Sequence, residues 1–405
     1  MRNEVSTLTT EENDSRFRLS FPWDLAAIFV LIRFILFVTI PYEGIQGYGD
    51  FLHFFNMARL GAPFIDFWVE FPPLFPFLSE ILEMFASGRA HTYGYLLILL
   101  LTVVQAGNLV LVSTFASKMY TQAKARKIGL VYLALIVGLP YGWWYFDVVV
   151  VFWMLLGLKY IFEESGIKAG FAIGLGMLTK WFPVLLIAEV WRRRSVKFAI
   201  VTTITALLLV VLVLGMLMLT SPDMTEASLR SQLSKGSWET VWALIDGNYS
   251  TGNFGPEIER YDPALATISR RAPAVVPPLV TFLLFGGIGI YLMYRVRGKE
   301  MITGVAFIGA TWSLFLLWSP GWSPQWILYL LPLVLLAIPF QRAVMISLSL
   351  VLISVLEWPI LLSRGLFDLI WVPVMLRTLI IILIFVEMAR IAISSSDGVP
   401  PEAMP

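Results

Sequence analysis

Three acidic residues stand beside apolar and aromatic segments, where carboxylates are uncommon. Asp50 opens a short helical pattern in which His53 follows on the same face. His53 would either form a hydrogen bond on that helix face or belong to a site. Glu70 directly precedes the sequence Phe-Pro-Pro, whose prolines favour a rigid, non-helical turn. Asp147 ends the aromatic run PYGWWYFD, immediately before an apolar segment. Such acids favour the handling of a polar ligand over a merely solvated acidic loop.

Two kinds of chemistry suit these carboxylates. Each could act as a base toward a hydroxyl group, which typically contributes about 10²–10⁴-fold to a rate. Asp50 and Glu70 together could instead hold a divalent cation, Mg²⁺ or Mn²⁺, that neutralises phosphate oxygens. The residue types alone leave both alternatives open.

Three cations interrupt apolar segments and are candidates for binding an anion. Lys180 lies within residues 169–191, three positions before Pro183, and its ammonium group is a point charge suited to phosphate. Arg33 and Arg377 lie inside long apolar runs. Each of these arginines would either contact the same phosphate or pair with an acid as a structural partner.

The composition is that of a membrane protein. Of 405 residues, 58% are hydrophobic and 14% are charged, whereas soluble domains have roughly 25% charged residues. At about 20 residues per span, we expect an all-α bundle of about 11–12 transmembrane or half-membrane helices. The net charge of +1 indicates no nucleic-acid partner, and the lack of cysteine excludes disulfides, thiolate catalysis and zinc–cysteine sites.

The order of polar and apolar segments predicts one transmembrane domain with two outer loops. The polar start predicts no cleavable signal peptide, and most Lys and Arg residues outside the spans fall on one side, which predicts cytoplasmic termini and a site facing outside the cell membrane. We expect one or two interfacial helices in the first loop. The expected parts are a tail at 1–22, the domain at 23–391 with loops 41–92 and 221–272, and a tail at 392–405.

Residues 169–191 have two possible arrangements. They either cross the membrane as one span or form a hairpin of two short helices with Lys180 at its tip. The hairpin is favoured, because the basic cluster that follows then joins the other basic segments on the inner side. Broken helices are tolerated in a bundle where they line a polar cavity.

Three stretches resemble known enzymes. They are the acid, ARLGAPF and EFPPL within residues 49–74, the run from YFDVVVV to KWFPVLLI, and the turn SPGWSPQ followed by WILYLLP. They are similar to motifs of the GT-C superfamily of glycosyltransferases, especially family 87 mannosyltransferases and the family of the GPI mannosyltransferase I catalytic subunit. That resemblance implies a GT-C-like fold and transfer of a sugar from a polyprenyl-phosphate donor.

The resemblance also implies roles for individual residues. Asp50 matches the acid taken as catalytic base or metal-linked acid, and Asp147 matches the acid of the next outer turn. Lys180 would contact the donor phosphate, and Gln325, with Trp322 beside it, would contact substrate from the SPGWSPQ turn. Some relatives carry a second aspartate where this chain has a tyrosine. That difference makes a two-aspartate metal site doubtful and leaves Glu70 as the replacement.

The expected function is transfer of a hexose, mannose by family, to a lipid or glycan acceptor with inversion at the anomeric carbon. Its partners would be the polyprenyl-phosphate-linked donor, the acceptor and membrane lipids. A transporter or flippase of lipid-linked sugars is the main alternative, and it would need charged residues that continue to the inner face. A scaffold subunit would have no use for the acids and Lys180 together.

Overall fold

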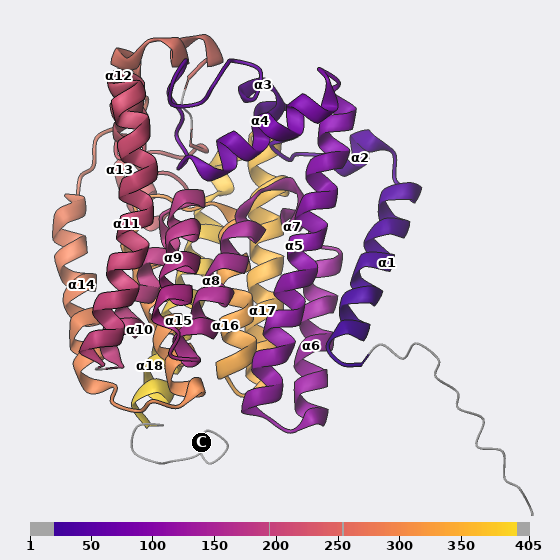
Figure 1. Cartoon of the computed structure of the whole chain (residues 1–405), viewed down its shortest axis with the longest axis vertical. Coiled ribbons are helices and arrows are strands. Elements are labelled where there is room, and N and C mark those ends of the chain that lie inside the picture. The colour runs from indigo at the N-terminus through magenta and orange to yellow at the C-terminus, as the bar shows by residue number, and fades with distance from the viewer. Residues whose placement is uncertain (1–19, 194, 253–254, 395–405) are drawn as a thin grey trace, which may run out of the picture.

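The computed structural model describes residues 20–193, 195–252 and 255–394, and it is an all-α polytopic membrane protein (Figure 1). In these ranges helices alternate with loops, and extended pairing is limited to two isolated bridges. Most of the expected tails, together with Arg194 of the basic cluster, lies outside the described residues.

Six helical segments are long and apolar enough to cross a membrane. The most apolar is α11, which is 25 residues long. At about 1.5 Å per residue it exceeds the roughly 30 Å hydrocarbon core. The six are α5 (Ala90–Met119), α11 (Val196–Thr220), α14 (Pro278–Arg295), α15 (Met301–Trp318), α17 (Phe340–Val355) continued by η5 (Leu356–Leu361) and η6 (Leu362–Arg364), and η7 (Phe367–Leu369) with α18 (Trp371–Ser394).

Shorter apolar helices complete the bundle. Among them α16 is buried along its whole length, and it packs against α5, α6, α8, α15, α17 and α18. A helix that is apolar on every side suits this central place. The shorter helices are α1 (Trp23–Thr39), α6 (Gln122–Val137), α7 (Tyr141–Trp144), α8 (Asp147–Phe162), α9 (Gly166–Thr179), η4 (Pro324–Trp326) and α16 (Ile327–Ala337).

The hairpin predicted at residues 169–191 is confirmed. Helix α9 ends at Thr179; the next residue, Lys180, has extended backbone angles, and the chain returns through η1 (Phe182–Leu185) and α10 (Leu186–Arg192). Glu164 precedes α9 and Arg193 follows α10, and their side chains lie 3.4 Å apart. The two ends of the hairpin therefore meet at one end of the bundle, with Lys180 at the tip.

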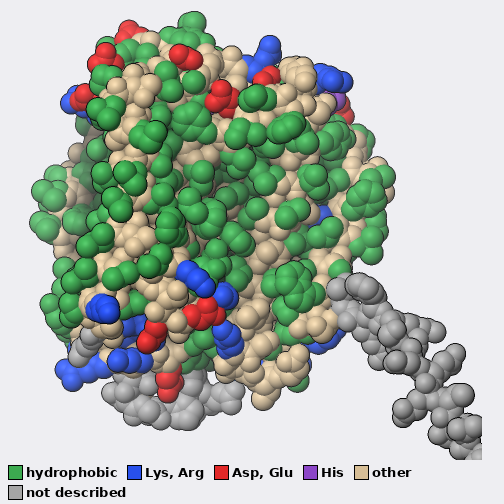
Figure 2. Space-filling view, viewed as in Figure 1, with side chains coloured by type: hydrophobic (Ala, Val, Ile, Leu, Met, Phe, Trp, Pro, Cys, Tyr) green, Lys and Arg blue, Asp and Glu red, His purple; other side chains and the backbone are tan. Residues whose placement is uncertain are grey.

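The two predicted outer loops meet at one end of the bundle, which we call the loop end (top of Figure 1). The first loop forms three short helices, one more than the upper expectation, and α5 begins inside its predicted range. The described chain starts and finishes at the opposite end (Figure 1), and apolar side chains cover the surface between the two ends (Figure 2). The loop elements are α2 (Tyr42–Gln46), α3 (Phe51–Met57), α4 (Leu74–Ala86), α12 (Pro222–Ser231), α13 (Val241–Asp246), η2 (Glu257–Tyr261) and η3 (Pro263–Thr267).

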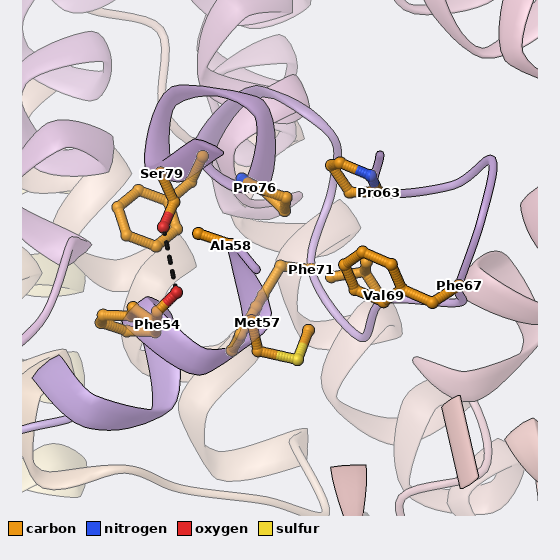
Figure 3. A pocket seen from close by; sticks show the side chains of 10 residues that line it. Phe54, Met57, Ala58, Pro63, Phe67, Val69, Phe71, Pro76 and Ser79 are labelled. Atoms are coloured by element: carbon orange, nitrogen blue, oxygen red, sulfur yellow. Dashed lines mark hydrogen bonds between the residues drawn. The ribbon is translucent and has the colours of Figure 1, made fainter. Parts of the chain in front are cut away.

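A small apolar hollow lies between α3, α4 and the segment that joins them (Figure 3). The residues around it pack together and stiffen the first loop. Phe54, Met57 and Pro76 line the hollow, and the Ser79 hydroxyl donates a hydrogen bond of 3.3 Å to the Phe54 carbonyl. This packing fixes α3, and with it the position of Asp50 at its start.

Candidate functional site

A cavity of about 810 Å³ lies at the loop end and brings together segments far apart in the sequence. Five of the residues singled out in the sequence line it: Asp50, His53, Glu70, Lys180 and Gln325. The second loop adds three charged residues that the sequence analysis did not select, Lys235, Glu239 and Arg260. The hairpin tip, both loops and the SPGWSPQ turn therefore share one site.

Asp50 immediately precedes α3, and its carboxylate caps no backbone N–H of that helix. The side chain is partly exposed to the cavity. Burial raises the pKa of Asp50 from its usual 3.8 to about 6, since the charges of His53 and Lys180, which lower it, do not outweigh burial together with Glu70. A carboxylate with such a pKa is poised to accept a proton near neutral pH.

Glu70 lies on a non-helical turn, as predicted, and is held by cations. Both terminal nitrogens of Arg260 donate to its carboxylate, one of them across 3.0 Å, and Nε2 of His53 lies 3.4 Å away. Burial alone would raise the pKa of Glu70, but Arg260 and His53 hold it below the usual range. Glu70 therefore stays ionised and ties the first loop to η2.

This arrangement does not fit a divalent cation held by Asp50 and Glu70. Both Glu70 oxygens already accept hydrogen bonds from Arg260.

Lys180 forms an ion pair with Asp147, with 2.7 Å between Nζ and Oδ1. The Tyr329 hydroxyl donates to the same Asp147 oxygen across 2.6 Å. Asp147 is buried behind the cavity wall, whereas Lys180 lines the cavity. Asp147, the acid expected at this turn, therefore affects the site only through Lys180, with which it forms the ion pair.

Lys235 supplies a second ammonium group to the cavity. Its Nζ lies 3.5 Å from the Glu70 carbonyl and over the Phe71 ring. Burial lowers the pKa of Lys235 to about 8, although the charge of Glu70 opposes this shift and that of Lys180 adds to it. The mixed composition of residues 221–272 gave no signal that this lysine, rather than its neighbours, would face the cavity.

Arg377 and Trp322 lie behind the cavity rather than on it. Arg377 takes the second of its two expected roles, as the structural partner of an acid, whereas Trp322 lacks the expected place on the cavity wall. The Arg377 guanidinium pairs with Glu357, donates to the Glu239 carbonyl and lies 4.3 Å from the Trp322 ring centre. The Thr240 hydroxyl donates to the Pro320 carbonyl across 2.8 Å. These contacts hold the SPGWSPQ turn against residues 237–240, so Arg377 positions the turn that carries Gln325.

Arg33 also lies away from the cavity. Its guanidinium lies over the Trp143 ring, with 4.2 Å to the ring centre, and donates a hydrogen bond of 2.7 Å to the Ile136 carbonyl. Helix α1 packs against α5 and α6. That packing directs Arg33 into the protein on the α1 side, which accounts for the difference from the expected phosphate contact.

The part of the cavity near η1 is apolar. Its wall continues from Lys180 to Phe182, Val184 and Leu185 of η1 and to Phe315 and Trp318 of α15. The Val184 side chain is also exposed at the protein surface. The site thus joins charged groups to a surface that suits a lipid chain.

Comparisons with protein-family models, curated proteins and solved structures give no match to this chain. The functional conclusion therefore depends on the geometry of the cavity and on the sequence resemblance.

Proposed function

We propose that the chain is a GT-C-type membrane glycosyltransferase that moves a hexose from a polyprenyl-phosphate sugar to a hydroxyl of a lipid or glycan acceptor. The observation that carries the proposal is the composition of one cavity. A carboxyl group with a pKa of about 6, two lysines and an apolar wall all line it. The cavity therefore has a group that can accept a proton, positive charges that can bind a phosphate and an apolar surface that can hold a lipid chain.

Each part of the cavity has a role in a single inverting displacement. The acceptor oxygen attacks the anomeric carbon while the bond from that carbon to the phosphate oxygen breaks. Asp50 accepts the acceptor's proton, and polyprenyl phosphate leaves with its negative charge facing Lys180 and Lys235. A phosphate leaving group needs no proton at neutral pH, so positioning and charge stabilisation carry most of the catalysis.

The membrane orientation belongs to the same proposal. The basic segments at the end opposite the cavity suit the cytoplasmic side of a cell membrane, and the cavity then faces outside. Mannose is the hexose suggested by the resemblance, and a divalent cation has no assigned step.

The test is a transfer assay with membranes that contain the protein. They are incubated with radiolabelled polyprenyl-phosphate mannose, glucose and arabinose in turn, and the lipid and glycan products are extracted and identified. We expect label to move to an acceptor from one donor and not from Asp50→Asn membranes. Movement of intact donor between the two membrane leaflets, without transfer, would contradict the proposal and favour a flippase.

A further inference from the structure

Glu239 is a buried acid on the cavity wall that the proposed displacement does not use. Its side chain is 6% exposed, and its Oε2 atom has no hydrogen-bond partner among the described residues. The backbone of Glu239 has a φ of +54°, which is uncommon for a residue with a side chain. Unsatisfied buried oxygens and unusual backbone angles both concentrate at binding sites.

The backbone around Glu239 is held on both sides. Trp238 exchanges hydrogen bonds with the SPGWSPQ turn, donating to the Pro320 carbonyl across 3.2 Å and accepting from the Trp322 N–H across 3.1 Å. Arg377 donates to the Glu239 carbonyl from behind. The side chain is therefore presented by a fixed segment, as a specific polar contact requires.

A second buried polar atom on the same wall lacks a partner. The Nε1 atom of Trp326, whose side chain is 5% exposed, donates to no acceptor in the described ranges. Its ring lies 5.4 Å from the Lys180 ammonium. Tyr145 also lines the cavity. Glu239 and Trp326 thus line the same cavity as the proposed base and the proposed phosphate site.

We infer that Glu239, with Trp326, binds hydroxyl groups of the sugar in the polyprenyl-phosphate donor and so sets which sugar is accepted. This inference rests on the proposed function and assigns the part of the cavity that would hold the sugar ring. Aromatic walls with a few well-placed polar groups are typical of small-molecule sites, and Trp238 and Trp358 supply such walls.

The protonation state of Glu239 suits a hydroxyl ligand. Burial raises its pKa well above the usual value, and the neighbouring Glu357 adds to the shift, while Arg377 and Arg271 oppose it. A neutral carboxylic acid both donates and accepts a hydrogen bond, as a sugar hydroxyl does. A glutamine at this position keeps both abilities.

The experiment measures ligand binding to purified protein in nanodiscs. Polyprenyl-phosphate mannose and polyprenyl phosphate without sugar are titrated into the parent, Glu239→Ala and Glu239→Gln. We expect Glu239→Ala to bind the sugar-bearing lipid about 10- to 100-fold more weakly, as for loss of a hydrogen bond to a buried group. Binding of polyprenyl phosphate should stay within about twofold, and Glu239→Gln should recover most of the loss.

Glu357→Gln is the matched control, because it breaks the ion pair with Arg377 behind the wall without changing a cavity residue. It should lower the unfolding temperature and weaken binding of the sugar-bearing lipid less than Glu239→Ala does. Equal weakening of both ligands by Glu239→Ala, or no change in either, would overturn the inference while leaving the proposed function intact. A parent protein that binds neither lipid would instead overturn the proposed function, and the inference with it.

Discussion

Lys180 and Asp147 form an ion pair of 2.7 Å that joins the tip of the α9–α10 hairpin to the first residue of α8. The acid is buried, whereas the lysine side chain is 15% exposed and lines the cavity. One ammonium group therefore neutralises a buried carboxylate and presents positive charge to the cavity. These two roles can be separated by mutation.

The first prediction separates them. Lys180→Met leaves Asp147 without its counter-charge, which should lower the free energy of unfolding by about 3 kcal/mol. It should also weaken binding of polyprenyl phosphate. Adding Asp147→Asn should recover most of the stability without recovering the binding, as measured by thermal unfolding and by titration in nanodiscs. Parent-like binding in the double variant would show that Lys180 is only a structural partner.

The second prediction concerns the base. Asp50→Asn keeps the size of the side chain and removes its ability to accept a proton, so transfer should fall by about 10²-fold or more. Donor binding should stay close to that of the parent, and the unfolding temperature should not fall, because Asp50 caps no helix N–H and burial disfavours its charge at neutral pH. Single-turnover measurements with saturating donor report the chemical step. Near-normal turnover would reject Asp50 as the base.

The third prediction is a bell-shaped dependence of transfer on pH. Asp50 must be deprotonated to act as the base, so activity should rise with pH around the pKa of about 6. Lys235 must be charged to attract phosphate, so activity should fall above its pKa of about 8. Lys235→Arg should remove the alkaline limb, because arginine stays charged there. If activity of the Lys235→Arg variant still falls at alkaline pH, another group causes that fall.

The stability contribution of Asp50 should run in the opposite direction to its activity. Its pKa is raised on folding, so the native state binds the proton more tightly than the unfolded chain does. The stabilisation is complete below its usual pKa of 3.8 and is lost as the pH rises through about 6. Asp50→Asn should remove this component from the pH dependence of the unfolding temperature.

Sequence periodicity and composition predicted most of the bundle, because each membrane span is one long, continuous apolar segment of the sequence. The hairpin was predicted because it places the basic cluster that follows on the same side as the other basic segments. The shared cavity was predicted because Asp50, Glu70 and Lys180 then lie at the same end of the bundle. Ion-pair partners could not be predicted in this way. Glu70 and Arg260 are separated by 190 positions, and nothing in the local pattern distinguishes this arginine from exposed ones nearby. Glu239 was missed for the same reason.

The fourth prediction concerns orientation. Ser250 lies in the second loop, at the loop end, and Ser195 lies between α10 and α11 at the opposite end. Because the chain has no cysteine, one can be placed at either serine alone. An impermeant maleimide added to intact cells should label Ser250→Cys and spare Ser195→Cys, with both labelled after the membrane is permeabilised. The reverse pattern would place the cavity on the cytoplasmic side.

The last prediction decides whether Glu70 braces the site or takes part in the chemistry. Glu70 and Arg260 are each 2% exposed, so Glu70→Gln leaves a buried guanidinium without its partner. The free energy of unfolding should fall by about 3–5 kcal/mol, and Arg260→Met should cost a similar amount. Combining the two changes removes both charges and should recover much of the stability. If Glu70 is a brace, the double variant should keep transfer activity within about tenfold of the parent, because Asp50 and the lysines remain in place. A double variant that unfolds like the parent but has lost transfer would assign Glu70 or Arg260 to the reaction itself.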